Sequence, residues 1–354
     1  MTIQESTKRY ESWLRRQIPL IRNDLNLKHK KMREDLFSFL RATFYRWAQT
    51  YPASLRRAPE VLGVGDLHIE NFGTWRDAEG RLVWGINDFD EVCRLPYTND
   101  LVRLAASAII AAHAGHIKLE EQALCAPILA GYLEGLEAGG RAFVLAEKHP
   151  RLRHMAYHRL RDPEPFWKKL DDPVALKDKI PSGALKGLER DLPEKHMELH
   201  ISHRIAGLGS LGRRRITAVV EWRGARIARE AKELAISAWH WGAGRAADQK
   251  IQYQRLLDSA VRCPDPFVFV RGRWVLRRLA PDCSRIELID LPSETDCTYL
   301  LHAMGFETAN VHLGSGPAKE ILANLRRRRK DWLPQAADLM VKTTVRDWKA
   351  WRDG

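Results

Sequence analysis

Two acidic segments decide how this chain is interpreted, and each follows a short apolar run: Gly65-Asp66-Leu67-His68-Ile69-Glu70-Asn71-Phe72-Gly73 and Ile86-Asn87-Asp88-Phe89-Asp90. The runs at residues 61–64 and 81–86 have the length and composition of strands. A turn at residues 77–80 separates them. The pattern predicts a hairpin-like unit of two strands with a carboxylate at the end of each.

The side chains of these segments suit the handling of Mg²⁺ and phosphate. Phosphoryl transfer from a nucleotide needs Mg²⁺ held against the phosphates and a carboxylate that orients the acceptor hydroxyl. Mg²⁺ takes oxygen ligands, of which only one or two are carboxylates. Asp66 as the base, the amide of Asn71 and the carboxylate of Asp88 would supply that set. The alternative is that these are ordinary turn and cap residues, since Gly, Asp and Asn favour turns.

The spacing of the first segment resembles the catalytic loop of protein kinases and aminoglycoside phosphotransferases, in which Asn follows the base Asp at the fifth position. By that resemblance Asp66 is the base, and Asn71 and Asp88 hold metal. Asp90 stands where the kinase Asp-Phe-Gly motif has glycine, and we count it with the metal set. Asp100 resembles the helix Asp that braces the catalytic loop in those families. His68 either contacts phosphate or packs inside the loop.

A glycine-rich turn further along the chain has the pattern Gly-x-Gly-x-x-Gly and comprises Gly207, Gly209, Ser210 and Gly212. It lies between two strand-like runs, whereas a dinucleotide-binding loop opens a helix. A kinase-type glycine loop joins two strands and covers the phosphates. We therefore expect these four residues to contact the phosphates of ATP.

Lys232 lies on a strand-like run after this turn, where a kinase carries the lysine that pairs with the nucleotide phosphates. Arg229 is the competing candidate, and a solvent-exposed lysine is the alternative interpretation. The usual partner of that lysine is a glutamate on the next helix. Residues 250–255 contain glutamines instead, which departs from the kinase pattern.

The remaining patterns predict an α+β protein. Helices are expected over residues 5–50, 98–137 with Thr98 or Asn99 as N-cap, 246–260, and from Ser293 onward; strands are expected over 201–205, 216–222, 225–231, 266–270 and 273–279. Residues 148–200 have little periodicity and are interpreted as a connector or a substrate-recognition insert. Three regions follow: a helical lobe with both acidic segments (1–200), a small β-rich nucleotide-binding lobe (201–292), and a helical segment returning to the large lobe (293–354).

An ordinary kinase runs from glycine loop to lysine, helix, catalytic loop and metal Asp. Here the catalytic pieces stand at residues 66–100 and the pieces of the small lobe at 207–280. A circularly permuted, protein-kinase-like fold of two lobes would bring them together.

The sequence resembles an uncharacterised bacterial family called domain of unknown function 2252. The resemblance rests on Phe37-Ser38-Phe39-Leu40-Arg41, on both acidic segments with Glu91, on Asp100-Leu101-Val102-Arg103-Leu104-Ala105-Ala106-Ser107, on Gly207 to Gly212, and on Lys232-Glu233. Ile236, where Pro is expected, and His312-Leu313-Gly314-Ser315-Gly316, in place of a more basic version, depart from it. The resemblance implies a kinase-like fold and assigns no substrate.

Composition narrows the class of protein and its partners. The five cysteines are scattered and form no C-x-x-C pair, which argues against zinc or disulfides and favours a reducing cytoplasm. The polar N-terminus and the short apolar run at 104–112 predict a cytoplasmic protein without a membrane segment. A net charge of +13 suits anionic partners. The densest basic cluster, residues 326–330, is best interpreted as a solvated helix face, which disfavours nucleic acid as a partner without excluding it.

The leading hypothesis is an ATP- and Mg²⁺-dependent phosphotransferase that acts on a small molecule or a protein. Adenylyl transfer is a variant, because it uses the same metal and nucleotide geometry. A metallophosphoesterase-like hydrolase is disfavoured, because the further histidine clusters of such sites are missing from the sequence. A non-catalytic, pseudokinase-like nucleotide-binding protein is the third class. The acceptor is not predicted, because acceptor pockets are built from variable elements.

Overall fold

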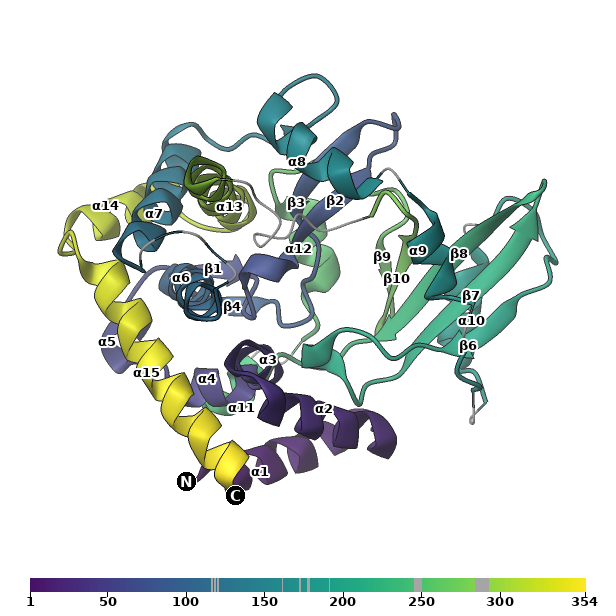
Figure 1. Ribbon diagram of the computed structural model, residues 1–354, viewed down its shortest axis with the longest axis horizontal. Helices are drawn as coiled ribbons and strands as arrows, with labels where there is room; N and C mark the ends of the chain where they lie inside the picture. Colours follow the sequence, from purple (N-terminus) through teal and green to yellow (C-terminus); the bar gives the residue numbers. More distant parts are fainter. Residues whose placement is uncertain are drawn as a thin grey trace.

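The computed structural model describes residues 1–115, 117, 119, 121–160, 162–171, 173–176, 179–190, 192–244, 250–283 and 293–354. The chain is an α+β protein, with helices on one side and a five-stranded sheet extending from the other (Figure 1). The helices are α1 (Ile3–Arg15), α2 (Arg22–Glu34), α3 (Leu36–Ala42), α4 (Phe44–Thr50), α5 (Ala53–Arg56), α6 (Tyr97–His113), α7 (Glu121–Glu137), α8 (Pro150–Leu160), α9 (Glu164–Lys168), α10 (Ser182–Arg190), α11 (Ala238–Gly242), α12 (Tyr253–Ser259), α13 (Glu294–Leu313), α14 (Ala318–Arg326) and α15 (Trp332–Asp353), with short 3₁₀ turns η1 (Ile69–Asn71) and η2 (Leu208–Ser210). The strands are β1 (Glu60–Gly63), β2 (Phe72–Arg76), β3 (Leu82–Ile86), β4 (Cys93–Pro96), β5 (Phe143–Val144), β6 (His200–His203), β7 (Arg215–Trp222), β8 (Ala225–Glu233), β9 (Phe269–Arg271) and β10 (Trp274–Leu279).

Helix α6 lies at the centre of the helical side. Its residues 97–111 are all buried, as expected for a helix with apolar side chains on every face. Helices α7 and α15 pack against it, and α13 packs along α7. The C-terminal helices therefore return to the core that the first part of the chain builds. The first and last helices also meet, since the Gln4 side chain donates to the Ala350 carbonyl over 2.6 Å.

The helical structure expected over residues 98–137 is present as two helices, α6 and α7. Helix α6 ends before Gly115, whose left-handed φ of 75° a continuing helix does not accommodate. The N-cap expected at Thr98 or Asn99 is wrong, because α6 begins directly after Pro96. Asn99 lies inside the first turn and reaches the loop after β1 instead.

The pairing expected between the two strands of the acidic segments is wrong as well. Strand β1 pairs with β4, and β3 pairs with β2, with Phe72 opposite Ile86. The turn at residues 77–80 therefore joins β2 to β3. The reason is that the loop after β1 leads into a separate strand, β2, and β2 is the partner of β3. Both acidic segments still follow strands, but the two strands belong to different sheets.

The five-stranded sheet has the order β6-β7-β8-β10-β9, and every neighbouring pair in it is antiparallel. One face carries apolar residues that pack on α10, including Ile216, Ala231 and Leu276 against Leu188. Helix α10 lies within residues 148–200, so part of that segment covers the sheet. The other face carries charged side chains, because successive residues of a strand point to opposite faces.

Two further expectations differ in their bounds. The helix expected over 246–260 is seen as α12 from Tyr253, and residues 246–249 lie outside the described part of the chain. The basic cluster at 326–330 begins at the last residue of α14 and continues into the connection to α15, rather than lying within one helix. Among the described residues, no helix combines the length and the apolar character needed to cross a membrane.

Candidate functional site

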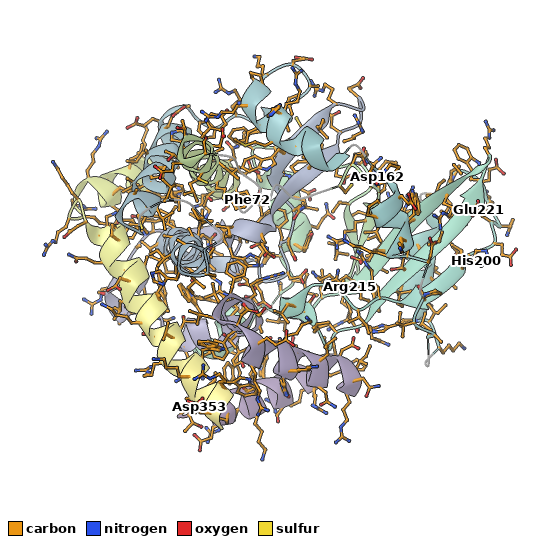
Figure 2. All side chains as sticks on the ribbon, viewed as in Figure 1. Phe72, Asp162, His200, Arg215, Glu221 and Asp353 are labelled. Atoms are coloured by element: carbon orange, nitrogen blue, oxygen red, sulfur yellow. The ribbon has the colours of Figure 1, made fainter. Side chains whose placement is uncertain are left out.

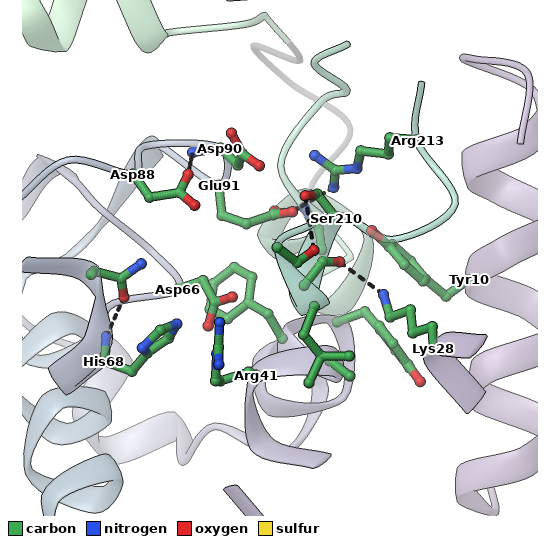
Figure 3. Close-up of a pocket in the computed structure, with 18 residues that line it drawn as sticks. Tyr10, Lys28, Arg41, Asp66, His68, Asp88, Asp90, Glu91, Ser210 and Arg213 are labelled. Carbon is green, nitrogen blue, oxygen red and sulfur yellow. Dashed lines mark hydrogen bonds and ion pairs between the residues drawn. The ribbon is translucent and has the colours of Figure 1, made fainter. Parts of the chain in front are cut away.

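A polar pocket lies where the loop after β1, the turn after β3, helices α2 and α3 and the glycine-rich turn between β6 and β7 meet (Figure 3). Its empty space, including the part open to solvent, measures about 630 Å³. The pocket is lined by Tyr10, Lys28, Arg41, Ala42, Phe44, Tyr45, Asp66, His68, Asn71, Asp88, Asp90, Glu91, Gly207, Leu208, Gly209, Ser210, Arg213 and Ala238. It thus brings together most of the residues predicted from sequence, from segments that lie far apart in the chain.

The loop after β1 is held by the first turn of α6. Asp100 is fully buried, and its carboxylate accepts the backbone N–H of Val64 over 2.7 Å and that of Gly65 over 2.9 Å. Asn99 donates to the Gly65 carbonyl over 2.9 Å, and the His312 ring lies 2.9 Å from Asp100. The contacts of Asp100 are those expected of a residue that braces the loop.

Asp66 is held by a buried arginine that sequence reasoning gave no role. The Arg103 Nε donates to Asp66 Oδ1 over 2.7 Å, and the guanidinium lies between the rings of Phe44 and Trp47. Burial raises the pKa of Asp66 above its ordinary value; the charge of Arg103 opposes this shift and that of Asp88 adds to it. One signal was present in the sequence, since Arg103 follows Asp100 by three positions and so lies on the same helix face.

Asn71 and His68 close the loop upon itself. The Asn71 Oδ1 accepts the backbone N–H of His68 over 2.7 Å, and the His68 Nδ1 accepts the backbone N–H of Glu70 over 3.2 Å. These contacts are those of capping residues. An amide oxygen has two lone pairs, however, so the second can still bind a cation in the pocket.

The turn after β3 meets the five-stranded sheet through Lys232. The Lys232 Nζ lies 3.3 Å from Asp88 Oδ1 and also contacts Asp90 Oδ2. Arg229, the competing candidate, stacks on Phe267 instead. Lys232 is thus paired with two aspartates of the acidic turn.

The pKa values of the two aspartates of this turn are shifted in opposite directions. The partial burial of Asp88 would raise its pKa, but the charges of Lys232, Arg277 and Arg215 outweigh this effect and hold the pKa well below the ordinary value. Its side chain keeps 36% of its surface exposed. Burial and the neighbouring Asp88 raise the pKa of Asp90. Asp88 is therefore the carboxyl of the pair that stays ionised more readily.

The charged face of the sheet carries a second set of residues that sequence reasoning missed. Glu230 is fully buried and accepts from Arg277 over 2.7 Å and from Arg215 over 3.1 Å; Arg204 contacts it as well. Arg215 lies opposite Lys232, so both share one face. Figure 2 shows Arg215 at the end of β7 next to the helical side, whereas Glu221 lies at the far end. The cations thus gather at the end of the sheet that borders the pocket.

The glycine-rich turn lies directly over Asp66. A Cβ on Gly209 would lie 3.4 Å from Asp66 Oδ2, an ordinary contact, and a tight 3.1 Å from the Arg41 carbonyl oxygen. Arg215 Nη2 donates to the Ser210 hydroxyl over 2.8 Å, which ties the turn to the sheet. Gly207, Gly209 and Ser210 line the pocket, whereas Gly212 lies outside it and packs against Leu25.

Four other charged residues of the pocket were not predicted: Lys28, Arg41, Glu91 and Arg213. Arg213 donates to Glu91 over 2.7 Å, and Glu91 also accepts the backbone N–H of Ala238 over 2.6 Å. This pair joins the acidic turn to the segment after the glycine-rich turn. Lys28 had a weak signal, because it occupies a position of the apolar stripe of α2 between Leu25 and Met32.

Comparison with known proteins gives one match. Residues 20–172 match the model of a family described as "Uncharacterized protein conserved in bacteria (DUF2252)". No curated protein and no solved structure matches the chain. The matched stretch contains Asp66, Asn71, Asp88 and Asp100 but ends before the glycine-rich turn, so the resemblance read from the sequence is supported over residues 20–172 and not over most of the chain. Within that stretch, the chain carries the features of this uncharacterised bacterial family.

Proposed function

We propose that the pocket binds a nucleoside triphosphate with Mg²⁺ and transfers a phosphoryl group to a hydroxyl of an acceptor. The observation that carries the proposal is the meeting of three segments in one pocket: the Asp66 loop, the Asp88 turn and the glycine-rich turn with its nearby Lys232. These are the parts that kinase-type phosphoryl transfer requires.

The order of the strands supports a circularly permuted, kinase-like arrangement of two lobes. In kinases the glycine loop joins two strands of the small lobe, and the lysine lies on the third strand. Here the glycine-rich turn joins β6 to β7, and Lys232 lies on β8. We propose residues 1–200 with 293–354 as the large lobe and residues 201–292 as the small lobe.

The donor atoms fit Mg²⁺. In the described part of the chain, no three His, Cys, Asp or Glu side chains are grouped as a metal site. Mg²⁺ bound with a nucleotide needs only one or two carboxylates beside phosphate and water. Asp88 and Asp90 supply these, and the buried Asp90 Oδ1 has no hydrogen-bond partner among the described residues. Bound there with Asn71, the cation would neutralise charge on the phosphates.

Asp66 would act as the base. Its Oδ1 is fixed by Arg103, and its Oδ2 faces Gly209 at the glycine-rich turn. The acceptor hydroxyl would give its proton to Asp66 as its oxygen forms a bond to phosphorus and the bond to the leaving diphosphate breaks. Lys232, with Arg215 and Arg277 nearby, would bind the phosphates, and Lys232 would exchange its contacts with Asp88 and Asp90 for phosphate oxygens.

A non-catalytic nucleotide-binding protein is the second candidate. It is favoured by the pairing of Lys232 with Asp88 and Asp90, which departs from the lysine–glutamate pair of active kinases. The two functions differ in turnover and not in nucleotide binding.

The test combines binding and turnover. We expect a non-hydrolysable ATP analogue to raise the unfolding temperature only with Mg²⁺, and Asp88→Asn to abolish this rise. Asp338→Asn, which changes a carboxylate on the surface of α15, is the matched control. Absence of any Mg²⁺-dependent rise in the wild type would refute nucleotide binding.

Turnover separates the two candidates. Asp66→Asn should keep the Mg²⁺-nucleotide affinity and slow turnover roughly 100- to 10,000-fold, the usual contribution of a general base. ADP as product supports phosphoryl transfer, and pyrophosphate supports adenylyl transfer. Nucleotide binding without turnover in the wild type would favour the non-catalytic protein.

A further inference from the structure

Lys28 is a buried cation that the proposed mechanism does not use. It lies on α2, and its Nζ donates to the Gly209 carbonyl over 2.9 Å. Among the described residues, no carboxylate lies within ion-pair distance of it. Figure 3 shows its side chain directed from α2 into the pocket, toward the glycine-rich turn.

A buried ammonium with only a neutral carbonyl as partner is costly for the fold. Burial lowers the pKa of Lys28 to about 8, with the charge of Arg213 acting in the same direction; the more distant carboxylates of Glu11, Glu91 and Asp66 oppose the shift without cancelling it. Burying a charge is tolerated when a counter-charge compensates it. An anion bound in the pocket would supply that compensation.

Arg41 offers a second cation on the same side of Asp66. Its Nη1 pairs with Glu70 over 2.6 Å, while its Nε is buried without a hydrogen-bond partner among the described residues. A Cβ built on Gly209 would lie within 3.4 Å of both the Arg41 carbonyl oxygen and Asp66 Oδ2, so the glycine-rich turn runs beside both residues. In Figure 3, Asp66 lies between Asp88 on one side and Lys28 on the other. In the same view Arg41 lies directly below Asp66, so Lys28 and Arg41 both stand apart from Asp88.

We propose that Lys28, assisted by Arg41, binds an anionic group of the acceptor, a phosphate or a carboxylate, and so orients the acceptor hydroxyl toward Asp66. This inference rests on the proposed function, because it assigns the acceptor side of the same pocket. The competing role of Lys28 is purely structural, as a latch that holds the glycine-rich turn onto α2.

Inorganic phosphate is the first probe, with acetate as the second arm. Titrations are made by calorimetry with Mg²⁺ and the non-hydrolysable ATP analogue present, so that the phosphate-binding surface around Lys232 is already filled. We expect Lys28→Met to weaken phosphate binding at least tenfold and Lys28→Arg to retain it. Lys30→Met, an exposed lysine of the same helix, should bind as the wild type does. Tighter binding of acetate than of phosphate would identify a carboxylate acceptor.

Two results would overturn the inference. Lys28→Met could bind phosphate like the wild type while unfolding at a lower temperature, which would identify Lys28 as a latch only. The wild type could also fail to bind either anion. Should Lys28→Met not fold, Arg41→Met takes its place with the same expected loss.

The pH dependence of sulfate binding is a further readout, which Lys28 would not produce if it were only a latch. Sulfate stays dianionic at any working pH, so its affinity for the wild type should fall as the pH rises through about 8 and Lys28 loses its proton. Lys28→Arg should bind sulfate equally at both ends of that range. Failure of the proposed function is recognised separately, because it appears as absent Mg²⁺-nucleotide binding, and the anion titrations can then be made without nucleotide.

Discussion

The two acidic segments of the pocket are held by different parts of the molecule. The Asp66 loop is held by α6, through Asp100 and Arg103, within the first third of the chain. The Asp88 turn is held by the distant sheet, through Lys232 and Arg213. The first contact set is internal to the helical side, whereas the second joins the helical side to the five-stranded sheet and the segment before it.

The surroundings of the two aspartates differ in the same way. Asp66 is mostly buried, with 19% of its side chain exposed, and is paired with Arg103; its pKa is raised. Asp88 is partly exposed among three cations, and its pKa is lowered. Surroundings that shift the pKa values of two carboxylates in opposite directions typically assign one carboxylate to proton transfer and the other to the stabilisation of charge. The difference supports Asp66 as the group that accepts a proton and Asp88 as the one that stays charged.

The largest expected effect comes from removing the cation that pairs with each aspartate, which is Arg103 for Asp66 and Lys232 for Asp88. Arg103→Met leaves Asp66 buried without its partner and should cost roughly 3–5 kcal/mol of unfolding free energy, measured by urea denaturation at pH 7. Lys232→Met should cost much less, because Asp88 keeps contact with solvent, and should instead abolish Mg²⁺-nucleotide binding. Arg329→Met, at an arginine that is 79% exposed, is the control and should change stability by about 1 kcal/mol or less. Equal losses for Arg103→Met and Lys232→Met would contradict the contrast between the segments.

The second prediction concerns Glu307, which supports the strand before the Asp88 turn. This buried side chain of α13 accepts the backbone N–H of Ile86 over 3.2 Å and the Asn310 amide over 2.8 Å. Burial raises its pKa to about 7 from an ordinary 4.5. The folded protein therefore binds this proton more tightly than the unfolded chain, so its stabilising effect is full below pH 4.5 and is lost as the pH rises to about 7.

The measurement is the unfolding free energy of Glu307→Gln relative to wild type across that pH range. The wild type should lose roughly 3 kcal/mol relative to the variant between the low and the high end. Glu137→Gln, at an exposed glutamate of α7, should run parallel to the wild type. Parallel curves for Glu307→Gln would show that Glu307 is already charged in the fold.

The smallest expected effect is a difference in stability between two glycine variants, one of them at Gly65, where the two segments touch. Gly65 has a φ of 82°, and a Cβ there would lie 2.5 Å from the backbone carbonyl oxygen of Glu91. Gly80 has a similar φ of 73° with open space around it. Gly80→Ala should therefore cost only the left-handed conformation, roughly 1–2 kcal/mol. Gly65→Ala should cost roughly 1–3 kcal/mol more, as overpacking does. Equal losses on thermal unfolding would mean that the segments can separate at this point.

The sequence predicted the local parts of the pocket well. The short apolar runs, the turns and the glycines are properties of a few neighbouring residues, and β1, β3, β7, β8 and β10 lie close to their expected positions. The pairing of β1 was missed, because its partner β4 follows the second acidic segment and has no turn signal that links the two. The end of α6 before Gly115 leaves little trace in the sequence, because a single glycine interrupts a long apolar pattern.

Residue types and spacing singled out Asp66, Asn71 and Asp88, which line one pocket, and Asp100, which holds the loop after β1. Only the tertiary structure decided which side chains became the partners of those residues. Arg103, Lys28, Arg213 and Glu230 are ordinary charged residues in the sequence, and only packing buries them and gives them their partners. Their pKa shifts and their pairing arise from low-dielectric surroundings assembled from helices and strands that lie far apart along the chain, and such surroundings leave no local pattern.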